Sequence, residues 1–176
     1  MILALILLFS QTFFSDILPV ESINWRNRRE LSWEDFQGAP NPTAPNAALT
    51  STSIKFQYNY DKKSFHYQLQ CVFHPDKSWV KIRNTRILAH EQGHFDIAEL
   101  YTRKLHRALL AYIFNAATIE KDISVIYRQV ASEQAAFQEQ YDRETNYSRN
   151  IPVQLDWQEK IDSTLATMAA YANYPQ

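Results

Sequence analysis

The chain has 176 residues, of which 45% are apolar and 14% aromatic, so it can bury one good hydrophobic core and is too apolar to be disordered. A formal net charge of -1 provides no positive field for nucleic acid, and no run of lysine and arginine indicates an anionic membrane surface. The single cysteine, Cys71, excludes a disulfide within the chain.

A short apolar run from Ile2 to Phe9 occupies the N-terminus. It is too brief to span a bilayer comfortably, and it lies where the hydrophobic part of a secretory signal peptide belongs. We therefore predict a signal peptide over residues 1–15, with an uncleaved N-terminal anchor or a buried first strand as the alternatives. The prediction makes residues 16–176 a single domain that is secreted or periplasmic.

Two stretches in the N-terminal third alternate between apolar and polar side chains, which is the period of a half-buried strand. The first covers residues 53–60 and the second residues 65–73, with Asp61–Ser64 between them as a turn. Together they predict an antiparallel hairpin with one aromatic face. Cys71 falls on the inward side of the second strand and is expected to be a small, inert hydrophobe.

Three helices are predicted after the hairpin. Asn84 fits an N-cap and begins a long helix that is expected to end near Phe114. A second helix is predicted from residue 119 to about residue 147, and Pro152 opens a third in the first turn, where its missing N–H does no harm. The short connection makes the first two helices an antiparallel pair. The apolar stripe of the third helix contains Leu155, Ile161, Leu165 and Met168.

His90 and His94 lie four residues apart on the first predicted helix, with Glu91 between them. Positions i and i+4 share a face of a helix, so both imidazoles can hold one metal ion. The same face continues through Ile97 and Tyr101 toward the core, where unpaired polar rings are costly. Zinc held by two histidines needs a third protein ligand and an open position for a water, whose proton Glu91 can accept. The motif predicts metal-assisted hydrolysis, with a peptide bond as the expected substrate.

Gly93 lies inside this helix, although the chain has only two glycines and a helical glycine costs about 1 kcal/mol relative to alanine. We therefore expect a close neighbour, such as a strand or loop that crosses the helix, to press against it. The alternative is a packing glycine with no metal nearby.

The other three histidines are not expected to be ligands. His66 lies on the polar face of its predicted strand, and His74 lies at the end of that strand before Pro75. His106 falls on the far side of the first helix and is expected to be exposed.

The third ligand is expected from the second helix. Counting from the turn near residue 116, His94 lies 22 positions back and His90 lies 26 back, which brings residues 138–142 and those shortly beyond opposite the pair. A carboxylate is the usual partner of two histidines at hydrolytic zinc, and Asp142 and Glu144 are the candidates. The pattern does not choose between them, because phase counting fails at helix ends. The alternative is an ordinary helix terminus with both side chains solvated.

Several segments of the chain share one recognisable pattern. They are Leu88–Glu99, Tyr141–Thr145 with Gln154 and Trp157 beyond, and the N-terminal Trp25, Leu31-Ser32-Trp33 and Asp35-Phe36. The pattern closely resembles an uncharacterised, mainly bacterial family of predicted secreted zinc-dependent proteases, and it covers nearly all of the chain after the leader. The resemblance implies a zinc site at His90 and His94 with Glu91 as the catalytic base.

One position departs from the pattern of that family. Its members usually place a histidine two residues after the threonine, where this chain has Tyr147. If that histidine is a ligand in the relatives, this chain binds zinc weakly or not at all. If it steadies the tetrahedral intermediate, the hydroxyl of Tyr147 can serve as the donor instead.

The sequence therefore predicts an α+β fold in which a small antiparallel sheet packs against long helices, the zincin-like arrangement, with the first long helix carrying the motif. The expected activity is that of an exported zinc metallopeptidase acting on peptide or protein substrates, which an exposed sheet edge can hold as an added strand. Two alternatives are a non-catalytic extracytoplasmic binding module with a degenerate metal site and a helical protein with a chance motif. Neither nucleic acid nor a membrane span beyond the leader is expected.

Overall fold

The computed structural model describes residues 20–176, so the leader predicted at residues 1–15 lies outside the described part of the chain. Within that part the chain has an α+β fold with a small antiparallel sheet and three α helices, which confirms the α+β part of the predicted fold class. No helix there is both long and apolar enough to cross a membrane. The elements are β1 (Ile23–Asn24), η1 (Trp33–Asp35), β2 (Ala48–Leu49), β3 (Thr52–Tyr60), β4 (Phe65–Phe73), β5 (Trp79–Val80), α1 (Thr85–Ala111), α2 (Ile119–Thr145), α3 (Ile151–Thr167) and η2 (Ala169–Tyr171).

The predicted hairpin is formed by β3 and β4. They pair antiparallel with Ile54 opposite Cys71, and the side chain of Asp61 accepts hydrogen bonds from the backbone N–H groups of Lys63 and Ser64 in the turn. β1 pairs with the other side of β4, which gives the order β1-β4-β3, while β2 and β5 form a separate two-stranded ribbon. β3 is therefore an edge of the larger sheet.

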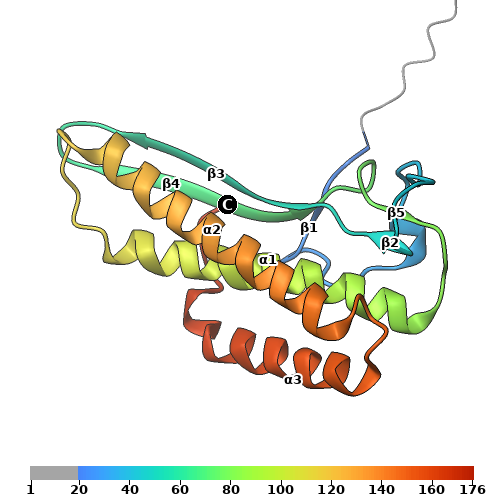
Figure 1. The fold of residues 1–176 in the computed structure, drawn as a ribbon. Helices are drawn as coiled ribbons and strands as arrows, with labels where there is room; N and C mark the ends of the chain where they lie inside the picture. The colour runs from blue at the N-terminus through green and yellow to red at the C-terminus, as the bar shows by residue number, and fades with distance from the viewer. Residues whose placement is uncertain (1–19) are drawn as a thin grey trace, which may run out of the picture.

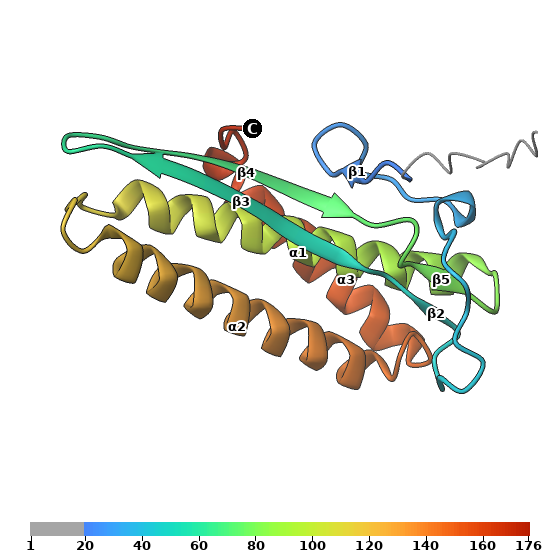
Figure 2. The same ribbon diagram turned by 90° about the horizontal axis from the view of Figure 1, so that it is seen from above.

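The elements are arranged in layers. Figure 1 shows the hairpin on one side of α1 and α2, and α3 on the opposite side. Seen from above, α1 runs beneath the hairpin and α2 lies beside it on the β3 side (Figure 2). α1 is consequently enclosed by the sheet, α2 and α3, which makes it the central helix of the fold.

The helices begin where the sequence predicts and end earlier. The side chain of Asn84 caps α1 by accepting a hydrogen bond from the backbone N–H of Ile87. α1 ends at Ala111 rather than near Phe114, because Tyr112 has an extended backbone with φ -69° and ψ 127°. α2 ends at Thr145, because Asn146 adopts the left-handed conformation. Apolar periodicity continued past both ends and did not reveal these changes of backbone.

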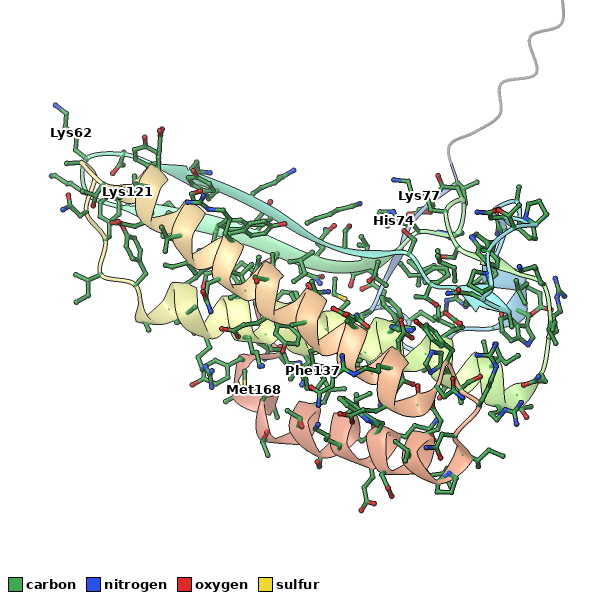
Figure 3. The ribbon with its side chains drawn as sticks, viewed as in Figure 1. Lys62, His74, Lys77, Lys121, Phe137 and Met168 are labelled. Atoms are coloured by element: carbon green, nitrogen blue, oxygen red, sulfur yellow. The ribbon has the colours of Figure 1, made fainter. Side chains whose placement is uncertain are left out.

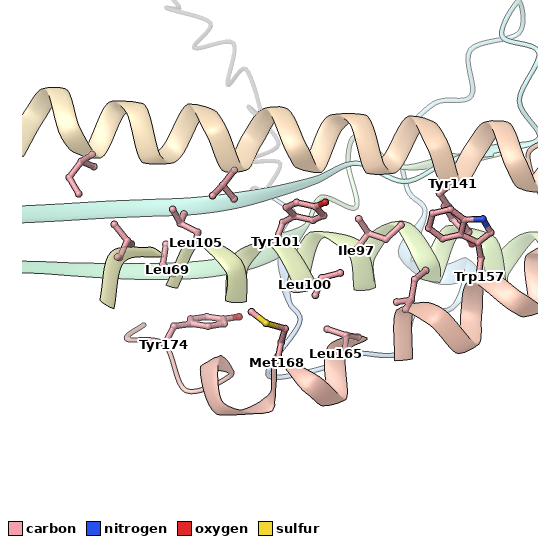
Figure 4. Close-up of a cluster of buried hydrophobic side chains, with 14 of the residues drawn as sticks. Leu69, Ile97, Leu100, Tyr101, Leu105, Tyr141, Trp157, Leu165, Met168 and Tyr174 are labelled. Atoms are coloured by element: carbon pink, nitrogen blue, oxygen red, sulfur yellow. The ribbon is translucent and has the colours of Figure 1, made fainter. Parts of the chain in front are cut away.

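The main hydrophobic core lies between α1, its two neighbouring helices and the hairpin (Figure 4). Phe137 of α2 and Met168, which follows α3, both belong to the side of the helical layer that packs inward (Figure 3). The prediction that Leu155 belongs to the apolar stripe of α3 is wrong, because this residue is 60% exposed. Fully buried members of this core include Leu69, Ile97, Leu100, Leu105 and Tyr141.

The prediction that His106 is exposed is also wrong. His106 is only 6% exposed, and its Nδ1 lies 2.9 Å from the hydroxyl oxygen of Tyr67. Burial lowers the pKa of His106. The far side of α1 does not face solvent, because β4 and the C-terminal segment after α3 cover it. His74, in contrast, is partly exposed and bonds to the hydroxyl of Ser53, away from the helical motif.

Candidate metal centre

Three potential ligand atoms meet between α1 and α2. Asp142 Oδ1 lies 3.0 Å from His90 Nε2 and 3.1 Å from His94 Nε2. One ligand atom from each of the three residues lies within 4.8 Å of the others. Two imidazoles and a carboxylate that leave a further position open are the donor set of hydrolytic zinc, so these residues fit that ion.

The antiparallel pairing of the two helices brings these side chains together. His94 Nδ1 lies 2.5 Å from Gln138 Oε1, and His90 Nε2 faces Asp142. Gln138 and Asp142 are the residues that counting from the turn places opposite His94 and His90. The count therefore predicted the right neighbours, and the carboxylate that reaches the imidazoles is Asp142.

Glu144 does not join this group. Its carboxylate accepts hydrogen bonds from Gln140 at 2.8 Å and from Trp157 Nε1 at 2.9 Å. These contacts fix Glu144 against α3, on a different face of α2 from Asp142. Of the two candidate third ligands, only Asp142 lies beside the histidines.

Two glutamine amides fix the orientation of the histidine rings. His90 Nδ1 lies 2.9 Å from Gln154 Oε1, and His94 Nδ1 lies 2.5 Å from Gln138 Oε1. The amide nitrogen of Gln138 donates to the backbone oxygen of His94, so the amide oxygen is the atom that faces the ring. Each Nδ1 therefore donates its proton to an amide oxygen. In a neutral ring Nε2 then presents a lone pair to Asp142, so the contact is favourable only when a metal ion lies between the atoms or the imidazole carries a second proton.

Charge at the cluster favours a cation in the same way. Burial lowers the pKa of His94. The hydrogen bond with Asp142 and the charge of Glu91 outweigh burial and raise this pKa from its ordinary value to about 9. Burial raises the pKa of Asp142, but its hydrogen bonds with His90 and His94 outweigh this and hold that pKa well below its usual range. Without a metal, a proton on His94 provides the positive charge.

Glu91 lies beside the cluster and is held by a residue from outside the helices. It is 4% exposed, and the hydroxyl of Thr50 donates a 2.7 Å hydrogen bond to its Oε2. Thr50 belongs to the segment between β2 and β3, so the motif helix and the sheet meet at this carboxylate. Sequence reasoning missed Thr50, because an isolated threonine in an irregular segment carries no periodic signal.

The neighbour of Gly93 is the side chain of Tyr141, not the strand or loop expected from the sequence. A Cβ atom at Gly93 would meet the Tyr141 hydroxyl oxygen at 2.4 Å and its Cζ at 2.8 Å. The Tyr141 ring stacks on His90 with centroids 4.6 Å apart, and its hydroxyl donates to the backbone oxygen of His90 and accepts from Gln154. The glycine therefore makes room for the ring that supports the first histidine.

Replacing Gly93 with alanine is expected to destabilise the fold by about 1–3 kcal/mol, the usual cost of overpacking a filled site. Urea unfolding of the metal-free protein measures this change without involving zinc. A glycine in an unobstructed helix would show the opposite sign, a gain of about 1 kcal/mol. That result would mean that Tyr141 does not lie against Gly93.

Tyr147 lies on the wall of the hollow in front of the cluster and is 47% exposed. Three consecutive non-glycine residues here have a positive φ: Asn146 at 48°, Tyr147 at 51° and Ser148 at 70°. Such a conformation is unfavourable and persists where the surroundings impose it, often at functional sites. This left-handed turn ends α2 and directs the chain past the cluster.

The cluster opens into a cavity of about 530 Å³. One wall consists of the segment around β2 with Thr50, and the other consists of the α2 face with Ala131 and Gln134. His90, Glu91, His94 and Asp142 form its base. The geometry therefore combines a metal-binding donor set, an adjacent carboxylate and space for a ligand of moderate size.

A comparison with known protein families matches residues 25–149 to DUF922, described as a bacterial protein of unknown function. The matched range contains the three residues of the cluster and Glu91, while Gln154 lies beyond it. Neither the curated proteins nor the solved structures contain a match to the chain. With more than half of its length matched, the chain belongs to the DUF922 family of bacterial proteins.

Proposed function

We propose that this protein is a zinc-dependent hydrolase with a zincin-like fold that cleaves peptide bonds. The observation that carries the proposal is the convergence of His90 Nε2, His94 Nε2 and Asp142 Oδ1 at a point where both Nδ1 atoms are already engaged. That arrangement leaves three electron-rich atoms facing one another, which is favourable only around a cation. Glu91 on the adjacent helix position supplies the fourth functional group.

Zinc, when bound, lowers the pKa of a coordinated water to about 7 and polarises a scissile carbonyl. Glu91 accepts a proton from the attacking water and delivers it to the leaving amine nitrogen. The hydrogen bond from Thr50 to Oε2 keeps the carboxylate at the edge of the cavity and leaves Oε1 for this transfer. Tyr147 also lines the cavity, and its hydroxyl would donate a hydrogen bond to the developing oxyanion.

The predicted leader extends the proposal to cellular location. A signal peptide at residues 1–15 would direct the hydrolase out of the cytoplasm, to the periplasm or the medium. The buried Cys71 is consistent with an oxidising or a reducing compartment, because the chain has no second cysteine with which its thiol could form a disulfide.

Metal content tests the proposal directly. The purified protein, refolded with zinc and freed of excess ion, should contain about one zinc per chain by elemental analysis. It should then hydrolyse a reduced, unfolded protein. Zinc without any hydrolysis would favour a binding module on the same fold, and no zinc at all would contradict the metal centre itself.

Zinc affinity is expected to rise with pH. In the metal-free protein His94 keeps its proton up to about pH 9, so zinc must displace that proton at lower pH. Apparent affinity should therefore increase by about tenfold per pH unit below pH 9 and level off above it. Competition with a chromophoric chelator, corrected for the chelator's own protonation, measures this slope. An affinity that does not change between neutral pH and pH 9 would contradict the His94 assignment.

The same protonation gives the metal-free protein a defined pH dependence of stability. His94 has a raised pKa in the folded state, so its ion pair with Asp142 is fully stabilising below about pH 6.5 and is lost as the pH rises through about 9. Asp142 has a lowered pKa, so its contribution is present above the pKa of an unfolded aspartate and is lost on acidification.

A further inference from the structure

The cavity at the metal centre continues along the sheet edge. A second hollow of about 220 Å³ shares Thr52, Ala131 and Gln134 with the first and extends to Ile54 and Tyr127. Its two sides are the edge strand β3 and helix α2, which contact each other through the stacked rings of Phe56 and Tyr127. The two hollows form one groove that starts at the cluster and follows β3 as far as Ile54.

The walls of this groove carry almost no charge. Among the described residues that line either hollow, none is a lysine or an arginine, and the acidic ones are Glu91 and Asp142 at the cluster. With zinc bound, its two positive charges balance these two carboxylates. A terminal carboxylate in the groove would therefore lack a cationic partner, and a terminal ammonium would lack an acidic one. Burying either charge without a partner is unfavourable.

The free edge of β3 adds a further requirement. β3 pairs with β4 on one side only, so backbone N–H and C=O groups near Thr52 and Ile54 can pair with a chain that lies in the groove, whereas further along the strand Phe56 stacks on Tyr127 of α2. An occupant that uses them is extended and continues past the cluster. The small Ala131 side chain and the uncharged Gln134 amide on the facing helix leave room for uncharged side chains of moderate size.

From these observations we infer that the groove binds an internal, extended and uncharged stretch of polypeptide, and that the enzyme cuts within chains rather than trimming their ends. This inference rests on the proposed hydrolase and specifies its substrate class. The inference makes Gln134 a specificity-determining residue, because it lines both hollows.

The first test compares peptides with blocked and free ends. The probe is a mixture of fluorescent peptides of about ten uncharged residues, either acetylated and amidated or with free termini. Binding is measured by anisotropy on the zinc-loaded Glu91→Gln protein, and cleavage by the unaltered protein is located by mass spectrometry. We expect blocked and free peptides to bind within about twofold of each other and to be cut at internal bonds.

The possible results separate the two proposals. Binding or stepwise trimming that requires a free terminus would overturn the inference and leave the hydrolase intact. Peptides that bind but are never cut by the zinc-loaded protein would instead overturn the hydrolase. Failure of every peptide to bind would overturn the groove as the substrate site.

A charge placed in the groove provides the second test. Gln134→Lys should improve the cleavage of peptides that carry Asp or Glu at one fixed distance from the cut by about tenfold relative to uncharged peptides. Ser132→Lys is the matched control, because Ser132 is exposed on α2 and does not line either hollow. An equal change in both variants, or none in either, would contradict the role of Gln134.

Discussion

Glu91→Gln is expected to leave zinc bound while it reduces peptide hydrolysis by about 10²–10⁴-fold, the contribution of a general base. The amide has nearly the shape of the carboxylate and can still accept the hydrogen bond from Thr50, so the cavity should not change. It cannot accept the proton of the attacking water. The measurement pairs zinc content by elemental analysis with the cleavage rate of an unfolded protein at saturating zinc.

The control for this experiment is Glu144→Gln, the same chemical change on the partner helix. Glu144 contacts Gln140 and Trp157, away from the cluster, and a glutamine there can keep accepting from the indole. This variant should retain zinc and activity within about twofold of the unaltered protein, as surface substitutions usually do. Full activity in Glu91→Gln would remove Glu91 from the mechanism, whatever the state of the metal.

The second large effect is expected for Asp142→Asn, which should weaken zinc binding by more than about 100-fold, because loss of even an outer partner of a ligand costs up to that amount. The amide side chain would keep the shape of the carboxylate but lose the negative charge that faces His90 and His94. Competition with a chelator measures the affinity, and circular dichroism checks that the helices remain folded.

Comparison of Asp142→Asn with Glu144→Gln decides between the two carboxylates that the sequence left open. The geometry requires a large loss of zinc affinity for the first and little change for the second. If Glu144→Gln proved to be the variant that loses zinc, the end of α2 would have to rotate to bring that residue to the imidazoles. The proposed ligand set would then be wrong.

The fold and the cluster follow from different kinds of sequence signal. Alternation in β3 and β4 and the helical stripes of α1 and α2 predicted the elements, because burial of one face repeats along each of them. Counting from the connecting turn predicted that residue 138 lies opposite His94 and residue 142 opposite His90, because both helices are regular over that span. The choice between Asp142 and Glu144 depends on side-chain direction near a helix end, which periodicity does not resolve.

Other parts of the site depend on contacts that no periodic pattern reports. Thr50 reaches Glu91 from an irregular segment, and Tyr147 reaches the cavity through a left-handed turn made without glycine. The prediction that His106 is exposed was wrong. It assumed that α1 buries only one face, as an amphipathic surface helix does, whereas α1 is covered on several sides. The tertiary arrangement, not the local sequence, determined each of these outcomes.

The hydrogen bond between Gln154 and His90 gives α3 a role beyond packing. Gln154 and Trp157 connect that helix to the histidine, to Tyr141 and to the end of α2. Gln154 orders the His90 ring that would bind the proposed metal. Metal binding and the packing of α3 would therefore be thermodynamically linked. At the proposed metal site this linkage would be reciprocal: a bound metal would stabilise the docked α3 by the same free energy with which a docked α3 would strengthen metal binding.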